Sequence, residues 1–302
     1  MRLMRYAVFT MVGPGPLEAR RLRTLLGGLF RHEPAAPLLV IVDDTGGELP
    51  NLSTLAPATC EIVRLVNPTK PDHNQLAFNT MLALRYLVTR KDIDFAVKLD
   101  TDALVIGPFA GQIGHYFDEH PDVGQVGRAD VKCDGTPASY GVYVPFVRRL
   151  LRRVQVWRSP SWGVAQAFRG DFAKFRKLVL KAAENGASGG KHCQGGAYAI
   201  ARRALDRLGD SGLLVGDWTT NVCGVEDLLA STLIAATGLK LVSMTKPGEP
   251  FGVEAVGLPF SPQELADKGY ALIHSVKNDK RFTEAEIVRF FERRDGLAAS
   301  AD

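Results

Sequence analysis

The stretch FAVKLDTDALVIGPF, residues 95–109, decides the fold prediction. Its first five residues are a short apolar run that predicts a buried strand, and Asp100 follows that strand directly. Asp102 stands two residues further on, and the apolar run ALVIG begins right after it. At a strand end, two such carboxylates can reach one cation, and carboxylates held between apolar segments need a counter-charge. The alternative for a lone D-x-D is a solvated turn after a strand.

The residue types at this turn suit a hard divalent cation. Carboxylate oxygens favour Mg²⁺ or Mn²⁺, and these ions keep coordination positions open for phosphate oxygens. We therefore expect Asp100 and Asp102 to bind a metal, with Asp100 also contacting the phosphorylated ligand.

Alternating strand and helix patterns surround this stretch. Strands are predicted over 6–11, 38–42, 61–66, 95–99, 239–243 and 270–274, and helices over 17–30, 76–88, 171–184, 202–208, 225–236 and 283–294. This order predicts an α/β fold with a mixed, mostly parallel sheet flanked by helices. Ligands of such sheets lie beyond the carboxyl ends of the strands, so Asp43 and Asp100 are expected to face one crevice.

Composition excludes several classes of protein. With 46% hydrophobic and 23% charged residues, the 302-residue chain is neither disordered nor collagen-like. Its apolar runs are too short for a membrane-spanning helix, and the N-terminal MRLMRYAVFTMVGPGP reads as a first strand rather than a signal peptide. The four cysteines form no CxxC pair, which argues against structural zinc and favours reduced thiols in a cytosol. No linker is visible, so residues 1–302 are expected to form a single domain.

Further chemistry-bearing residues lie downstream. His274 ends an apolar strand, where a neutral imidazole can ligate Mn²⁺, although a hydrogen-bonded core histidine is the alternative. Lys277 is placed to meet a diphosphate or to be a surface lysine. Gly195 and Gly196 either let the backbone approach a ligand or belong to an ordinary loop.

Acidic residues open the helix predicted over 225–236. Glu226 and Asp227 can serve as a general base or complement the helix dipole. Asp217, beside Trp218, is a third candidate for binding or proton transfer.

Four ordered motifs carry a resemblance. KLDTDALVIGPF (98–109), HCQGGAYAIARRAL (192–205), GVEDLLAS (224–231) and ALIHSVK (271–277) resemble glycosyltransferases of the GT-A fold, and are most similar to the β1,3-galactosyltransferase and Fringe-like family. The resemblance implies a Rossmann-like fold in which the D-x-D binds the metal–diphosphate of a sugar nucleotide and His274 completes the metal site. It places the catalytic base on Asp227, with Glu226 as the fallback, and implies uridine contacts for Thr10 and Asp43.

The resemblance implies a function as well. The chain is expected to be a metal-dependent, inverting hexosyltransferase that moves a sugar from a UDP-sugar to a hydroxyl of a glycan or glycolipid. Residues 1–130 would be the nucleotide-binding half and 131–302 the acceptor-binding half. The absence of a membrane anchor and of disulfide-rich patterns suggests a bacterial, cytoplasmic enzyme of polysaccharide biosynthesis.

Alternatives remain open. The family usually has three consecutive acidic residues where this chain has Asp100-Thr101-Asp102, and L-D-x-D-x-x-V-x-G is also similar to retaining, glycogenin-like transferases. A nucleotidyltransferase or phosphohydrolase on a similar sheet, and a non-catalytic sugar- or lipid-binding module, are the other hypotheses.

An arginine-rich segment spans 148–158. Between Gly135 and Gly170 there are six arginines and no acidic residue. Interleaved with apolar residues, they predict contact with the inner membrane face, grip on an anionic acceptor, or a solvated basic segment. No nucleic-acid recognition motif accompanies them, so no nucleic-acid partner is expected.

Overall fold

The computed structural model describes residues 4–35, 37–47, 49, 51–68, 76–140, 144, 172–188, 190–215 and 226–297. The arginine-rich segment 148–158, Asp217 with Trp218, and Cys223 lie outside the described residues. Among the helices that are described, none has the length and apolar character needed to cross a membrane.

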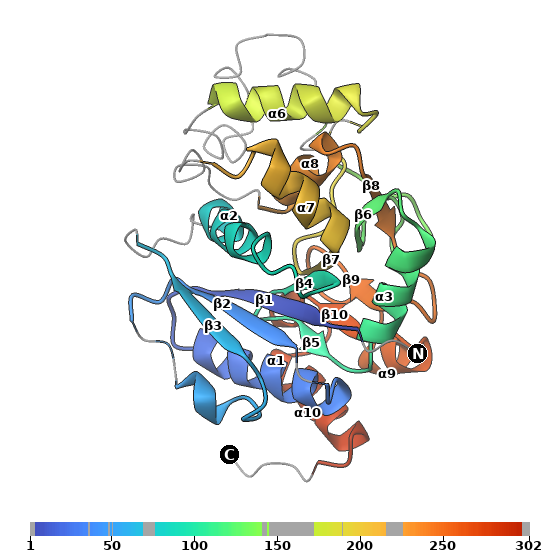
Figure 1. The fold of residues 1–302 in the computed structure, drawn as a ribbon. Helices are drawn as coiled ribbons and strands as arrows, with labels where there is room; N and C mark the ends of the chain where they lie inside the picture. Colours follow the sequence, from blue (N-terminus) through green and yellow to red (C-terminus); the bar gives the residue numbers. More distant parts are fainter. Residues whose placement is uncertain are drawn as a thin grey trace.

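A seven-stranded sheet with the order β3-β2-β1-β4-β7-β6-β8 forms the centre of the molecule (Figure 1). Its strands are β1 (Tyr6–Val12), β2 (Leu38–Asp43), β3 (Ile62–Val66), β4 (Phe95–Leu99), β6 (Val123–Gly127), β7 (Ala197–Ala201) and β8 (Lys240–Ser243). The first four are mutually parallel, β7 is antiparallel to β4 and β6, and β8 is parallel to β6. The predicted α/β fold with a mixed, mostly parallel sheet flanked by helices is confirmed.

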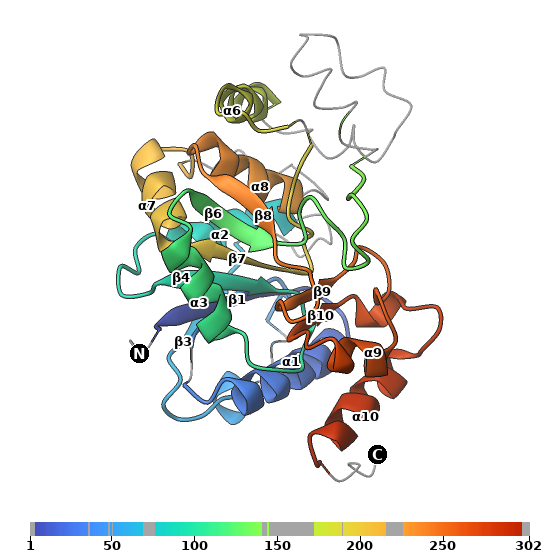
Figure 2. The same cartoon turned by 90° about the vertical axis from the view of Figure 1, so that its right-hand side faces the viewer.

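Helices cover both faces of this sheet (Figures 1 and 2). They are α1 (Glu18–His32), α2 (Leu76–Leu87), α3 (Ala110–Glu119), α6 (Phe172–Glu184), α7 (Arg202–Ser211) and α8 (Glu226–Ala236). Helix α1 lies against one face because four leucines at helical spacing, from Leu22 to Leu29, form a buried stripe. Helices α2, α7 and α8 lie on the opposite face, and α6 packs outside them against α8.

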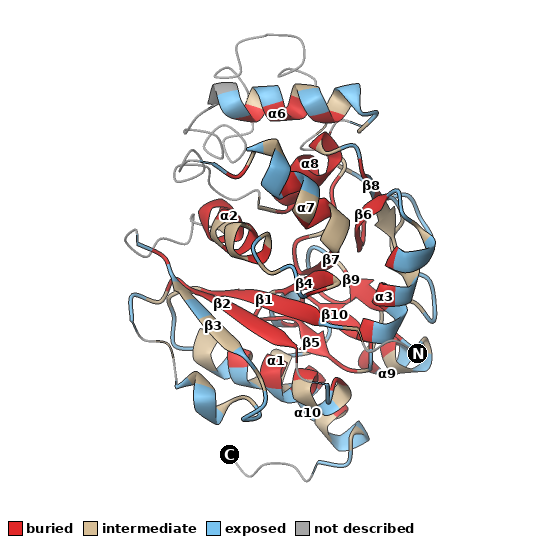
Figure 3. Ribbon diagram, in the orientation of Figure 1, coloured by how far each residue is buried: buried red, intermediate tan, exposed pale blue. Residues whose placement is uncertain are grey.

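The central strands are buried on both faces (Figure 3). Every residue of β1, β2 and β4 is buried, which explains their almost uninterrupted apolar sequences. Lys98 on β4 interrupts this apolar pattern with a charged side chain that is fully buried. A charge in that position needs partners, and they lie in the site described below.

The chain passes from the carboxyl end of β4 into a second, three-stranded sheet. It pairs β5 (Leu104–Val105) antiparallel with β10 (Leu272–His274), and β10 parallel with β9 (Phe251–Val253). Val105 and Leu272 face the core shared with the main sheet, whereas Leu104 and Ile273 face the other way. The outer face is covered by α9 (Pro262–Asp267) and α10 (Glu284–Arg294).

The outer helix α6 offers a test of the packing. Replacing the buried Phe175 with alanine is expected to lower the free energy of unfolding by about 3–5 kcal/mol, because it leaves a cavity between α6 and the core. Chemical denaturation measures this loss. The control is Lys177→Ala, an exposed position on the same helix, with an expected change within about 0.5 kcal/mol. Equal effects of the two substitutions would contradict the packing of α6 on the core.

Candidate active site

Two strand pairings bring the distant motifs together. Because Ile273 pairs with Leu104 in the antiparallel β5–β10 ladder, His274 arrives beside the turn that carries Asp102. The Val276 N–H donates a hydrogen bond of 3.2 Å to the Asp102 carbonyl and ties the two segments together. Residues 172 positions apart in the sequence thus meet near the carboxyl end of β4.

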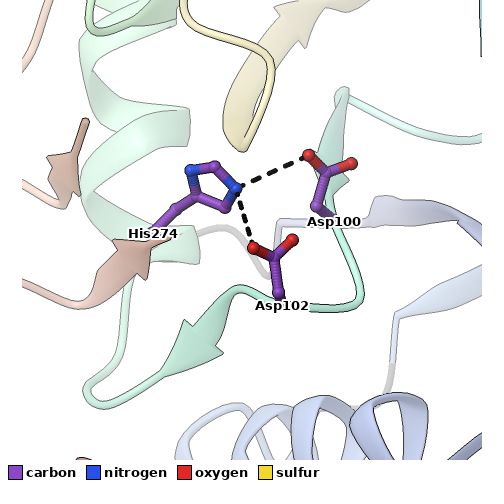
Figure 4. Close-up of side chains that lie close together, drawn as sticks. All are labelled: Asp100, Asp102 and His274. Carbon is purple, nitrogen blue, oxygen red and sulfur yellow. Dashed lines mark ion pairs between the residues drawn. The ribbon is translucent and has the colours of Figure 1, made fainter. Parts of the chain in front are cut away.

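Asp100, Asp102 and His274 form one cluster (Figure 4). The Nε2 atom of His274 lies 3.4 Å from Asp102 Oδ2 and 3.7 Å from Asp100 Oδ2. One ligand atom from each of the three residues lies within 4.8 Å of the others. Two carboxylate oxygens and one imidazole nitrogen form a donor set that suits a divalent cation such as Mn²⁺.

The hydrogen bonds around the cluster fit metal binding. The Nδ1–H of His274 donates to the Glu254 carbonyl at 2.9 Å, which directs Nε2 toward the two carboxylates. The Ser275 hydroxyl donates to Asp102 Oδ2 at 2.7 Å and orients that carboxylate. Asp102 Oδ1 is buried and accepts no hydrogen bond, although Lys277 Nζ lies 3.3 Å from it. A buried carboxylate oxygen that accepts no hydrogen bond, next to an oriented imidazole nitrogen, can therefore act as a metal ligand.

Electrostatics hold the cluster in a charged form. Burial disfavours ionisation of Asp102, but the His274 ring, Lys277 and Ser275 outweigh it and hold the pKa of Asp102 well below its usual range. Burial likewise disfavours the imidazolium form of His274, but Asp102 and Asp100 raise its pKa above the ordinary value. A cation placed between these groups would replace the ring proton as the positive partner of the carboxylates.

The glycine pair separates this cluster from a second acidic group. A Cβ atom on Gly196 would lie 2.0 Å from Cγ of His274, and one on Gly195 would lie 2.6 Å from Oε1 of Glu226. The Gly196 carbonyl also accepts a hydrogen bond of 3.0 Å from the Asp100 N–H. Both positions therefore need glycine because side chains from two sides pack directly against this backbone. The strand that follows, β7, agrees with a loop that leads into a strand.

Glu226 and Asp227 begin α8, as the sequence predicts for acidic residues of a first helical turn. Their environments differ. Burial and repulsion from Asp227 raise the pKa of Glu226 to about 7. Burial also opposes ionisation of Asp227, but the His192 ring, 3.3 Å away, and the Leu228 N–H outweigh it and lower the pKa of Asp227.

A buried lysine joins the two acidic groups. Lys98 Nζ lies 2.5 Å from Asp100 Oδ1 and 3.9 Å from Glu226 Oε1, and it donates to the Gly195 carbonyl. Burial alone would lower the pKa of Lys98, but the carboxylates of Asp100 and Glu226 raise it. Lys98 therefore remains a cation inside the protein and neutralises part of the acidic charge.

Asp43 is the last residue of β2, whereas Thr10 lies two residues before the end of the neighbouring β1, so the expectation that Thr10 ends its strand is wrong. Thr10 lies in β1, and its buried hydroxyl has no hydrogen-bond partner in the described structure. Asp43 ends β2 and accepts hydrogen bonds from the Arg64 guanidinium and from Thr45. The next residue, Asp44, binds the side-chain amides of Asn67 and Asn79 at 3.0 Å.

Sequence reasoning missed Lys98 and His192 as members of the site. A signal existed for Lys98, because it is a charge in an apolar strand two residues before Asp100, and such residues share a face. His192 stands in the quoted HCQGG motif, but nothing local indicates that it meets a residue 35 positions later.

Comparisons with known proteins are sparse at the level of sequence. No protein-family profile matches the chain, and no curated protein sequence does. Among solved structures, the crystal structure of S. aureus TarS 1–349 is similar, with a TM-score of 0.45 and 11% sequence identity. The alignment covers 80% of this chain and 58% of the TarS chain. At this level of similarity the likeness says nothing about function, which rests on the site itself.

The packing of His274 on Gly196 can be tested with one methyl group. Gly196→Ala is expected to weaken Mn²⁺ binding at least about tenfold, because the added Cβ displaces the imidazole ring from the carboxylates. Electron paramagnetic resonance of free Mn²⁺ measures the affinity. Gly111→Ala in α3 is the matched control, since its Cβ would meet no atom within 4 Å. Unchanged Mn²⁺ affinity in Gly196→Ala would contradict the metal site.

Proposed function

We propose that this protein is a metal-dependent glycosyltransferase that transfers a hexosyl group from a UDP-sugar to a hydroxyl of a glycan or glycolipid. The observation that carries the proposal is the convergence of Asp100, Asp102 and His274 at the carboxyl edge of a mostly parallel sheet. A second carboxylate pair lies just beyond the glycines. One site thus holds a cation-binding group and a separate candidate base, the two parts that such a transfer needs. The order of the motifs supports a protein similar to the β1,3-galactosyltransferase and Fringe-like family.

On the donor side, Asp100, Asp102 and His274 would hold a divalent cation, Mn²⁺ or Mg²⁺. When bound, such a cation neutralises charge on the diphosphate of the departing UDP. Lys277, whose side chain is partly exposed beside Asp102, is placed to contact the same diphosphate. We assign Thr10 and Asp43 to the uridine side of the site, because both lie near the carboxyl ends of the adjacent parallel strands β1 and β2.

On the acceptor side, Asp227 is the proposed general base. The acceptor hydroxyl attacks the anomeric carbon, the bond from that carbon to the diphosphate oxygen breaks, and the hydroxyl proton passes to Asp227. This direct displacement inverts the anomeric configuration. Glu226 is the fallback base, and its position beside Gly195 also suits binding of acceptor hydroxyls.

Loss of the buried carboxylate tests the donor side. Asp102→Asn is expected to weaken Mn²⁺-dependent UDP binding at least about tenfold, because a neutral amide is a poor metal ligand. Isothermal titration of UDP with and without Mn²⁺ measures the effect, and thermal unfolding reports on the fold. Asp267→Asn, at an exposed position of α9, is the control with unchanged binding. UDP affinity that is independent of Asp102 would refute the donor site.

Loss of the base tests the acceptor side. Asp227→Asn is expected to keep UDP binding within about twofold while transfer slows by about 10²–10⁴-fold, the usual contribution of a general base. A screen of UDP-sugars and acceptors for release of UDP measures transfer, and the anomeric configuration of the product reports inversion. Full transfer by Asp227→Asn would exclude Asp227 as the base. Release of pyrophosphate in place of UDP would indicate a nucleotidyltransferase.

A further inference from the structure

Two buried histidines of the site share one hydrogen-bond arrangement. The Nδ1 atom of His274 lies 2.9 Å from the Glu254 carbonyl, and that of His192 lies 2.8 Å from the Gly190 carbonyl. A carbonyl oxygen only accepts hydrogen bonds, so Nδ1 carries the proton in both rings. Among the described residues, Nε2 of His274 faces the carboxylates of Asp100 and Asp102, whereas Nε2 of His192 faces the carboxylate of Asp227.

The contact between His192 and Asp227 indicates the protonation state of the pair. With Nδ1 protonated, a neutral ring would point the Nε2 lone pair at an Asp227 oxygen 3.3 Å away, which is repulsive. One proton between Nε2 and Oδ2 makes the contact favourable. Because the pKa of His192 is raised and that of Asp227 is lowered, this proton lies on the ring, and the pair is an imidazolium and a carboxylate. Burial works against the charged ring, but Asp227 raises the pKa of His192 above the ordinary value.

Packing holds both partners in place. His192 is 4% exposed and Asp227 is 7% exposed. The ring of Tyr140 lies against the imidazole, with 4.9 Å between ring centroids. The Tyr140 hydroxyl donates to the Ala129 carbonyl, and the His192 carbonyl lies 3.3 Å from the same hydroxyl. Asp227 Oδ1 accepts a hydrogen bond of 2.7 Å from the Leu228 N–H, so each carboxylate oxygen has its own donor.

Other charges face the pair from the surrounding elements. Arg128, at the end of β6, disfavours the charged form of His192. Lys98 on β4 favours the carboxylate form of Asp227, whereas Glu226 on α8 lies close enough to oppose it. The His192 ring contacts Asp227 at 3.3 Å and lowers its pKa more than Lys98 does, so we expect the imidazolium to dominate.

We propose that His192 is a positioning residue that, as an imidazolium, holds Asp227 ionised and aims its free lone pairs at the acceptor hydroxyl. The proposal rests on the proposed function, because it assumes that Asp227 receives the acceptor proton. In that step the hydroxyl proton moves to Asp227, while His192 keeps both of its protons and stays bound to the carboxylate.

The proposal has a consequence for pH dependence. A positive charge next to a carboxylate lowers its pKa, so removal of the imidazolium raises the pKa of Asp227. A general base works only above its own pKa, so the acidic limb of the rate profile moves to higher pH. A residue with a purely structural role would lower the rate at every pH and leave the limb in place.

The first experiment examines the His192–Asp227 pair by a measurement that does not depend on enzymatic activity. Nuclear magnetic resonance of the full-length protein with ¹⁵N-labelled histidine follows the His192 ring during a pH titration, with His192→Gln providing the assignment. We expect the ring to titrate above pH 6.5, and Asp227→Asn to lower the midpoint by about 1 unit or more. The same midpoint in both proteins would overturn the pair.

The second experiment measures transfer against pH in His192→Gln and His192→Asn. We expect the acidic limb of kcat to move up by about 1 pH unit, with the affinity for UDP and Mn²⁺ unchanged within about twofold. The control is His115→Gln, which removes a histidine from an exposed pair with Glu119 on α3 and leaves the profile unchanged. An unmoved limb in both His192 variants would overturn the positioning role.

The two experiments separate this proposal from the proposed function. An intact pair in a protein that releases UDP from no sugar nucleotide would overturn the glycosyltransferase assignment and the role of His192 together. If the His192 titration midpoint does not depend on Asp227 while the protein still transfers sugar through Asp227, only the role of His192 is overturned.

Discussion

The site depends on one buried cation, the ammonium group of Lys98. Asp100, Glu226 and Asp227 converge on the same edge of the sheet, and like charges at such distances repel one another strongly in a protein interior. Lys98 lies between them with no exposed surface and bonds Asp100 at 2.5 Å. Its ion pairs offset part of the cost of burying both signs of charge, and they link the candidate metal-binding group to the candidate base.

The directions of the strands place the two glycines, His274 and Glu226 around Lys98. Because β7 runs antiparallel to β4, its amino end meets the carboxyl end of β4, and Ala197 pairs with Leu99. The two glycines before β7 therefore lie directly beside Asp100. Lacking side chains, they let His274 approach from the small sheet and Glu226 from α8. A parallel strand at this position would carry the glycines to the opposite edge, away from the carboxylates.

We assign two different roles to the same side-chain type because its surroundings differ. Both histidines donate Nδ1–H to a backbone carbonyl and turn Nε2 toward acidic oxygen atoms. His274 meets two carboxylates at 3.4 and 3.7 Å, a geometry that suits a cation held in common. His192 meets one carboxylate and forms an ion pair with it. The first arrangement suits the metal ligand that we propose for His274, and the second suits the positioning role that we propose for His192.

The α/β fold could be predicted from the sequence, because periodic helices and apolar strands are local patterns. Elements α1, α2, β1 and β4 lie where these patterns predict them. The sequence also placed Asp100 after a strand and Glu226 at the start of a helix. The predicted elements did not include α3, β5, β6, β7, β9 or α9. Most of these are short or rich in glycine and polar residues, so their local pattern is weak. The meeting of His274 with Asp102 was expected from the resemblance alone, and the meeting of His192 with Asp227 was not expected at all. Those meetings follow from strand register and from packing between distant segments, and no local sequence pattern encodes either.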